Sequence, residues 1–226
     1  MQEVLRETKP GMVVIHNFSG YTTYDRFMPL AGELVEIVRA EAPNAEIVIL
    51  KTWAYREDCS FYRDGPEYFT ARNQSEMYSA LTECYDRLAK DLGGLRQIPI
   101  GDAIQNCREL PGWRLAAPVL DPKTGEVVER PREVRSDNDG WKLVGGNHPA
   151  TDYKHLGTPG KYLAACVFYE WLFGESVLEN PFVPKGLDAE DAAFLRRMAH
   201  RTVSEGLRPQ KPTGTATIPP ESRTSP

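Results

Sequence analysis

The sequence predicts an α/β protein with three layers, α/β/α, built around an open parallel β-sheet. Two short apolar runs, MVVIH at residues 12–16 and AEIVILKTW at 45–53, have the composition of strands that are buried on both faces. Between and after these runs, apolar residues recur at helical spacing, so strands and helices alternate along the chain. Because parallel strands need crossover connections, this alternation favours a parallel sheet with helices on both faces.

Sequence signals at both ends define the first two helices. Apolar residues at helical spacing predict a helix from Asp25 onward, and Pro-Asn at residues 43–44 ends it. After the second strand, Asn73 and Glu76 have the spacing of an N-cap and its return acceptor at the start of another helix. The glycine pair at 93–94 closes that helix.

A third, shorter strand is predicted at 97–100, and a helix follows it at once. Asp102 is expected to cap the start of that helix. Two later helices each stop at a glycine, and His200 in the second of them is expected on the solvated surface. These helices are predicted at residues 158–173, before Gly174, and at 188–205, before Gly206.

Two stretches depart from the alternation. Residues 114–134 alternate in character around the turn sequence DPKTG at 121–125, which predicts a β-hairpin. The longer segment 114–147 is expected to form an insertion over the mouth of a site. Residues 208–226 are rich in Pro, Thr and Ser and are predicted to be a disordered tail after a body at 1–207.

The composition excludes several classes of protein. The chain has 226 residues, of which 41% are hydrophobic and 26% charged, so disorder throughout is excluded. No apolar run reaches the roughly eighteen residues of a membrane span, and residues 1–11 have no apolar stretch of signal-peptide type. A net charge of −5 with scattered Lys and Arg argues against nucleic acid as a partner. The four cysteines lack metal-ligand spacing, and we expect no metal or organic cofactor.

His155 is the leading candidate for acid–base chemistry. It lies three residues after Asp152 and directly before an apolar helix. In an Asp-x-x-His turn, the carboxylate can reach back to the imidazole, set its tautomer and stabilise the imidazolium. The spacing alone also fits an ordinary helix-entry turn, in which Asp152 only caps the helix and His155 faces water.

Several segments together resemble one enzyme superfamily. The run HLGTPGKYLAACVFY at residues 155–169 resembles the last block of the SGNH (GDSL-type) hydrolases, where an Asp-x-x-His turn carries two members of a Ser-His-Asp triad. NAEIVILKTWAY at 44–55, Met-Tyr at 77–78 and IGDAIQN at 100–106 look like a bacterial branch of that superfamily with unassigned function. The resemblance covers roughly residues 12–176.

The resemblance implies a flavodoxin-like sheet and a serine hydrolase that acts on esters, with carbohydrate esters as a plausible substrate class. His155 would be the general base and Asp152 its orienter. The alternative is a non-catalytic binding or remnant domain that keeps the fold and lacks the nucleophile.

The sequence departs from the superfamily in its first blocks. Relatives begin with a strand that ends in a Gly-Asp-Ser or Gly-Asn-Ser turn, whose serine is the nucleophile, and residues 1–226 contain no such turn. Asn17, with His16 behind it, is the nearest candidate oxyanion donor, and a buried, hydrogen-bonded His16 is an equal alternative. Ser19 lacks the sharp strand-to-helix elbow of a nucleophile. We therefore expect an N-terminally incomplete domain whose missing strand and serine come from a further segment or another chain.

Three aromatic residues are candidates for substrate binding. Trp53 and Tyr55 follow the second strand, and ligands of open α/β sheets bind at the carboxyl ends of strands. Packing of Trp53 under the neighbouring helix is an equal alternative. Trp141, between glycine-containing stretches, is a candidate platform for a sugar ring, or else it pins the hairpin to the body.

Overall fold

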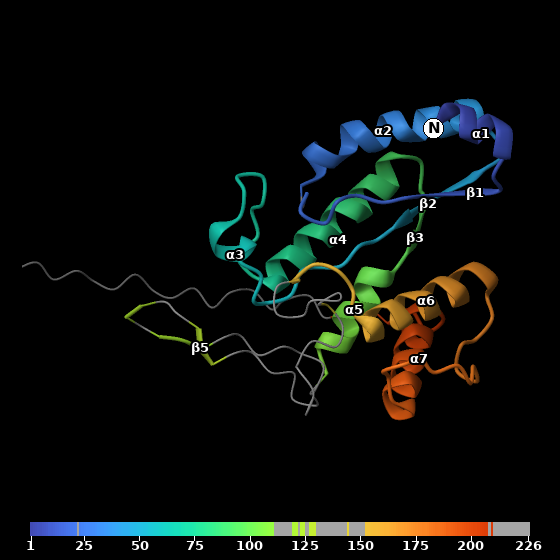
Figure 1. Cartoon of the computed structure of the whole chain (residues 1–226). Coiled ribbons are helices and arrows are strands. Elements are labelled where there is room, and N and C mark those ends of the chain that lie inside the picture. Colours follow the sequence, from blue (N-terminus) through green and yellow to red (C-terminus); the bar gives the residue numbers. More distant parts are fainter. Residues whose placement is uncertain are drawn as a thin grey trace, which may run out of the picture.

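The computed structural model describes residues 1–21, 23–110, 119–121, 123–124, 127–129, 144, 152–207 and 209. Their helices and strands are labelled in Figure 1. In chain order the elements are α1 Gln2–Thr8, β1 Met12–Ile15, α2 Tyr24–Glu41, β2 Glu46–Leu50, α3 Phe61–Asp64, α4 Gln74–Asp91, β3 Arg96–Ile98, α5 Ile100–Arg108, β4 Val119–Leu120, β5 Val127–Glu129, α6 Thr158–Phe173 and α7 Ala189–Val203.

The first three strands form one parallel sheet in the order β1-β2-β3. Met12 of β1 lies opposite Glu46, and Leu50 of β2 lies opposite Ile98 of β3. The chain passes from each strand to the next through a long helix, first α2 and then α4. The prediction of an open parallel sheet with helical crossovers is therefore confirmed.

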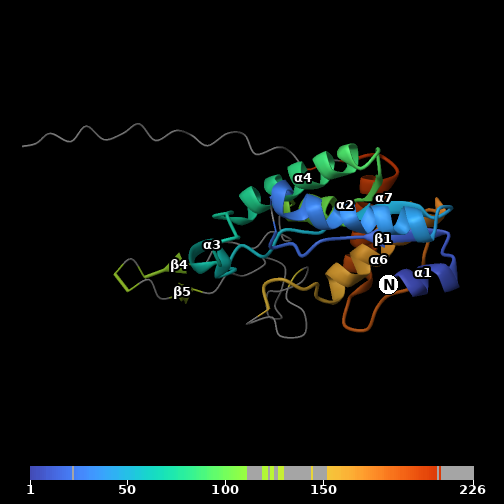
Figure 2. The ribbon, with the colours of Figure 1, turned by 90° about the horizontal axis from the view of Figure 1, so that it is seen from above.

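Alternating side chains of β2 divide the core between the two faces of this sheet. Ile47 and Ile49 are buried with the apolar faces of α2 and α4, whereas Val48 is buried with α5, α6 and α7. Figure 1 shows α2 on one side of the strands and α6 and α7 on the other, and Figure 2 shows α2 and α4 side by side. The predicted three-layer α/β/α architecture is confirmed.

The second and third strands end earlier than the sequence predicts. β2 stops at Leu50 because β3 stops at Ile98, so the strand has no ladder partner beyond that point. Lys51 still donates its backbone N–H to Ile98, but its carbonyl accepts from Gly101 in the first turn of α5. A side chain at Gly101 would place its Cβ 2.1 Å from the carbonyl oxygen of Thr52, so this close approach requires glycine.

The helix signals are largely confirmed. α6 spans the predicted 158–173, and Gly174 after it has a φ of 68°. The side chain of Asn73 accepts the backbone N–H of Glu76 at 2.8 Å, as expected of an N-cap. The return bond of Glu76 was predicted to reach the backbone of Asn73, but it reaches the preceding residue. The Glu76 carboxylate accepts the backbone N–H of Arg72 at 3.0 Å and also binds its guanidinium.

The expectation for His200 is wrong. Its side chain is only 25% exposed, and its Nδ1 lies 2.7 Å from Oε1 of Glu170, which is 1% exposed. Ser204 also donates to that carboxylate. Because an unpaired buried carboxylate is costly, these polar groups face α6 rather than solvent.

α1 and α3 are short helices that the sequence analysis did not predict. β4 and β5 pair antiparallel, which confirms the hairpin. Of the predicted 114–147 insertion, the structure describes only residues 119–121, 123–124, 127–129 and 144, and of the predicted 208–226 tail only residue 209, so both predictions lie largely outside the described residues.

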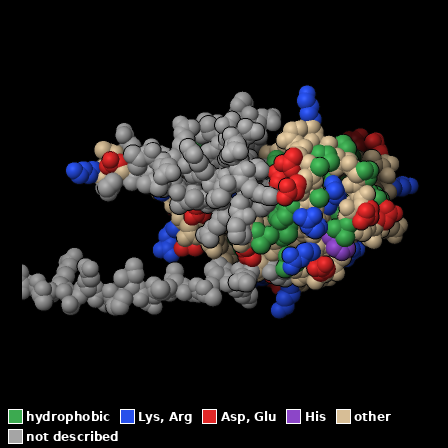
Figure 3. All heavy atoms as spheres, turned by 90° about the horizontal axis from the view of Figure 1, so that it is seen from below, with side chains coloured by type: hydrophobic (Ala, Val, Ile, Leu, Met, Phe, Trp, Pro, Cys, Tyr) green, Lys and Arg blue, Asp and Glu red, His purple; other side chains and the backbone are tan. Residues whose placement is uncertain are grey.

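No helix within the described ranges is long and apolar enough to cross a membrane. Figure 3 views the molecule from the side of α6 and α7, where basic and acidic side chains are interspersed on the described part of the surface. No stripe of one sign of charge runs over that described part.

Candidate functional site

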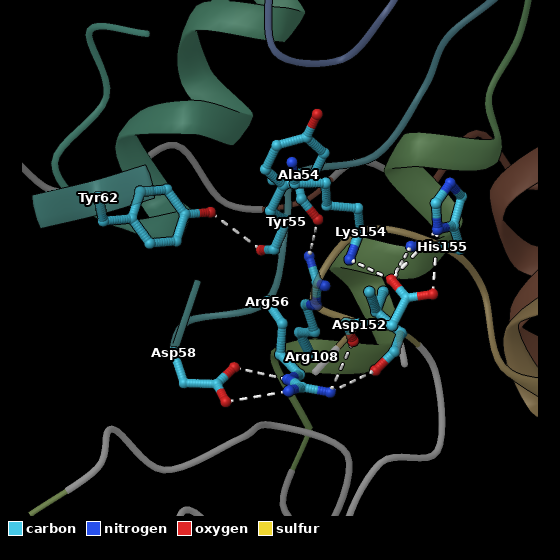
Figure 4. Close-up of polar contacts among 10 residues, drawn as sticks. Ala54, Tyr55, Arg56, Asp58, Tyr62, Arg108, Asp152, Lys154 and His155 are labelled. Atoms are coloured by element: carbon cyan, nitrogen blue, oxygen red, sulfur yellow. Dashed lines mark hydrogen bonds and ion pairs between the residues drawn. The ribbon is translucent and has the colours of Figure 1, made fainter. Parts of the chain in front are cut away.

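The 152–155 turn joins the two residues that the sequence predicts to act together. Nδ1 of His155 lies 3.0 Å from Oδ2 and 3.2 Å from Oδ1 of Asp152 (Figure 4). Oδ1 also accepts the backbone N–H groups of Lys154 and His155, each at 3.0 Å, so the turn is closed on the carboxylate. The His155 side chain is 80% exposed. Since Asp152 holds Nδ1, the ring nitrogen available for proton exchange with a substrate is Nε2.

The electrostatics of the turn favour an ionised Asp152. Burial raises the pKa of this carboxyl, but the backbone N–H groups of His155 and Lys154 and the His155 ring lower it by more. The pKa of Asp152 therefore lies below its ordinary value of 3.8. At neutral pH a carboxylate faces the imidazole, and a carboxylate stabilises the imidazolium that forms when the ring takes a proton.

The segment after β2 holds the backbone of this turn at three consecutive carbonyl oxygens. The carbonyl of Asp152 accepts from Nη1 of Arg56 at 3.2 Å, and that of Tyr153 accepts from the Arg56 backbone N–H at 3.0 Å. The carbonyl of Lys154 accepts from the indole Nε1 of Trp53 at 2.7 Å. The turn is therefore fixed to the carboxyl end of β2, although about one hundred residues separate the two segments.

Trp53 and Tyr55, both predicted to line a cleft, occupy different environments. Trp53 is half-buried and contacts the 152–155 turn. Tyr55 is 2% exposed, and its ring stacks on Phe69 with a centroid separation of 5.9 Å. Burial raises the pKa of the Tyr55 hydroxyl above its ordinary value. The ring of Tyr55 therefore belongs to the core beneath the site.

His16 and Asn17 lie just after β1, at the same edge of the sheet, where His16 is exposed. The backbone N–H of Asn17 donates to the Tyr85 hydroxyl at 3.4 Å, and its side-chain Nδ2 donates to the carbonyl of Tyr21 at 3.4 Å. The Tyr85 hydroxyl is also 3.0 Å from Oγ1 of Thr52, so Tyr85 ties the ends of β1 and β2 together. Within the described part of the chain, the hydrogen bonds that Asn17 donates lead to Tyr85 and Tyr21 and not to the 152–155 turn. Trp141 lies outside the described residues.

A buried charge cluster at this edge was missed by the sequence analysis. Nζ of Lys51 lies 2.6 Å from Oδ1 of Asp102, and these side chains are 4% and 3% exposed. The Tyr78 hydroxyl donates to the same oxygen at 2.7 Å. The expectation that Asp102 caps α5 is therefore wrong: it is the third residue of that helix, and its carboxylate turns toward the strand end. In the sequence, the cluster was indicated by Lys51, a lysine that directly follows an apolar strand.

No group of three or more His, Cys, Asp or Glu side chains within the described ranges could hold a metal ion.

No family model and no curated protein matches the chain. Among solved structures, the chain is similar to a DUF4886 family protein from Bacteroides uniformis, with a TM-score of 0.66. The sequence identity is 23%, and the match covers 94% of this chain and 69% of that one. The likeness is one of fold. It supports the three-layer architecture, while any chemistry must be argued from the residues themselves.

Proposed function

We propose that this chain carries the acid–base part of an SGNH-type serine ester hydrolase, with carbohydrate esters as the substrate class. The observation that carries the proposal is the 3.0 Å contact between Oδ2 of Asp152 and Nδ1 of His155. A carboxylate on Nδ1 and an exposed ring with Nε2 available are what a general base of the Ser-His-Asp type requires. The substrate class comes from the resemblance to the superfamily.

In the proposed reaction, Nε2 of His155 takes the proton of a serine hydroxyl as its Oγ attacks the ester carbonyl. Asp152 stabilises the resulting imidazolium. The tetrahedral intermediate collapses, the C–O bond to the alcohol breaks, and Nε2 returns the proton to the departing alcohol oxygen. Water then attacks the acyl-enzyme with the same base, which releases the acid and regenerates the serine.

The oxyanion of the intermediate needs donors at the carboxyl end of β1. The Nδ2 amide of Asn17 carries two N–H groups, of which one donates to Tyr21 within its own loop. In the proposed reaction, the second N–H of Asn17 donates a hydrogen bond to the oxyanion.

The proposed nucleophile is a serine on a strand that pairs with the outer edge of β1. In the described sheet, β1 is a terminal strand that pairs with β2 on one side. The catalytic serine would then enter at the same sheet edge as Asn17 and the 152–155 turn. A segment that ends in Gly-Asp-Ser or Gly-Asn-Ser is the type of strand that the superfamily uses there.

One observation favours a second candidate function, a non-catalytic binding domain of the same fold. Residues 1–226 contain no Gly-Asp-Ser or Gly-Asn-Ser turn. Ser19 lies in a turn after Asn17 and is half-buried. In a binding domain, the 152–155 turn would serve only to start α6.

A fluorophosphonate probe separates these candidates because it labels only an activated serine. We expect no labelling of the 226-residue chain alone. We expect labelling when the chain is joined to an N-terminal strand segment that ends in Gly-Asn-Ser, and loss of labelling in its His155→Ala variant. A folded, joined protein that stays unlabelled favours the binding domain. Labelling of the chain alone that Ser19→Ala abolishes makes Ser19 the nucleophile.

A further inference from the structure

Arg56 has an unusual set of contacts for a residue that follows a strand. Its side chain is 3% exposed, and its Nε and Nη2 bind the two carboxylate oxygens of Asp58 at 2.5 and 3.0 Å. Its Nη1 donates to the carbonyls of Val144 and Asp152, each at 3.2 Å. The guanidinium also lies 5.1 Å from the ring centroid of Tyr153.

Different nitrogens of the guanidinium bind different groups, and this fixes the orientation of its plane. Asp58 occupies one edge of the planar fork with two bonds, so the plane cannot rotate freely. The remaining nitrogen, Nη1, is thereby aimed at the carbonyl of Asp152. The ion pair with Asp58 also compensates the charge of a guanidinium that is almost fully buried. Lysine could supply the charge, but not both edges of the fork.

The carbonyl that Arg56 holds belongs to the same residue whose carboxylate holds His155. The backbone of Asp152 is bonded to Arg56 at 3.2 Å, and its side chain is bonded to His155 Nδ1 at 3.0 Å. Tyr153, next in the turn, accepts from the Arg56 backbone N–H at 3.0 Å. The position of the imidazole relative to the sheet therefore depends on how firmly Arg56 holds the start of the turn.

We propose that Arg56, oriented by Asp58, is the positioning residue of the Asp152–His155 pair. The catalytic use of this positioning rests on the proposed function. The contacts of Arg56 themselves are present without substrate or nucleophile. Arg56 acts through the backbone of Asp152 and does not touch the reacting atoms. It fixes the carboxylate in the orientation that keeps a proton on Nδ1 of His155 and leaves Nε2 free to accept one.

The test is a nuclear magnetic resonance measurement on the 226-residue chain with four variants. Arg56→Lys keeps the charge and removes the fork, and Arg56→Met removes both. Asp58→Asn keeps one acceptor and should give an intermediate effect. The matched control is Arg108→Lys, because Arg108 is also buried and donates at 3.0 Å to Ala54 in the same segment as Arg56. Thermal unfolding shows which variants are folded.

Two readouts report positioning rather than stability. Long-range ¹H–¹⁵N correlation gives the tautomer of His155, and the side-chain carbonyl ¹³C shift gives the titration of Asp152. In the wild type we expect the Nδ1–H tautomer to dominate. In Arg56→Lys we expect a mixed tautomer and a rise of roughly half a pH unit or more in the Asp152 midpoint, as its hydrogen bonds loosen. We expect neither change in Arg108→Lys, even where its melting temperature falls as far.

Three outcomes would overturn the proposal. The first is a folded Arg56→Lys variant with the wild-type tautomer and Asp152 midpoint, and the second is an equal change in Arg108→Lys. The third applies if Arg56→Lys does not fold: wild-type readouts in a folded Asp58→Asn variant then contradict the orienting role. Failure of the proposed function is separate, because a shifted tautomer in Arg56→Lys supports positioning even if the completed protein labels no serine.

Discussion

The indole nitrogen of Trp53 donates a 2.7 Å hydrogen bond to the carbonyl oxygen of Lys154, the residue directly before His155. This bond links the end of β2 to the candidate site across a separation of about one hundred residues in sequence. With the two bonds from Arg56, it means that the turn's backbone is held by the sheet rather than by α6 alone.

Trp53→Phe should therefore loosen the turn while leaving most of the ring packing in place. The Lys154 carbonyl loses its donor, and we expect a loss of about 1 kcal/mol in the free energy of unfolding, measured with urea. Trp171→Phe is the control, because it removes an indole on α6 whose ring lies 4.2 Å from the Arg96 guanidinium. If Trp53→Phe is as stable as the wild type, the bond contributes nothing to the turn.

Asp102→Asn should be strongly destabilising because it leaves the ammonium of Lys51 buried beside a neutral amide. Loss of one partner of a buried ion pair typically costs about 3–5 kcal/mol. Replacing both residues, as Lys51→Met with Asp102→Leu, removes the unpaired charge and should recover much of that loss. Equal urea midpoints for the single and double variants would argue against a coupled pair.

The pH dependence of Asp152 follows from the direction of its pKa. Because the pKa in the folded protein lies below the ordinary 3.8, the ionised carboxylate stabilises the fold. This stabilisation is fully present above the ordinary pKa, and it is lost as the pH falls through the folded value. The difference in unfolding free energy between the wild type and Asp152→Asn should thus shrink as the pH falls from about 5 toward 2.5. A difference that grows over that range would contradict the direction of the shift.

The thiols should be unreactive in the folded protein. All four cysteines are buried, and burial raises the pKa of both Cys84 and Cys166 to about 11. At pH 8 these groups are therefore protonated thiols without access to reagent. We expect Ellman's reagent to react slowly with the native chain and with all four cysteines in urea. A fast-reacting thiol under native conditions would show that one of these sites opens to solvent.

The sequence predicted α6 well because its signals are local. The apolar run is continuous, and Gly174 ends it with a φ of 68°, a conformation that glycine adopts without strain. α1 gave no such signal, since only Leu5 in it is buried. α3 is too short for its apolar spacing to be recognised.

The candidate site was only partly predictable for a related reason. Asp152 and His155 are three residues apart, so their contact follows from a turn that the sequence itself encodes. The contacts of Arg56 with residues 144, 152 and 153 are set by how the sheet and the returning chain meet. No spacing rule connects such residues, and burial of an arginine cannot be inferred from its neighbours in sequence.

We propose that His155, oriented by Asp152, acts as a general base for a serine. The most direct measurement is the rate of p-nitrophenyl acetate hydrolysis by the chain joined to a Gly-Asn-Ser strand segment, with and without His155→Ala. We predict a loss on the order of 10³-fold or more in His155→Ala, and a strong loss in Asp152→Asn. A folded His155→Ala variant whose rate stays within about tenfold of the unsubstituted enzyme would contradict it.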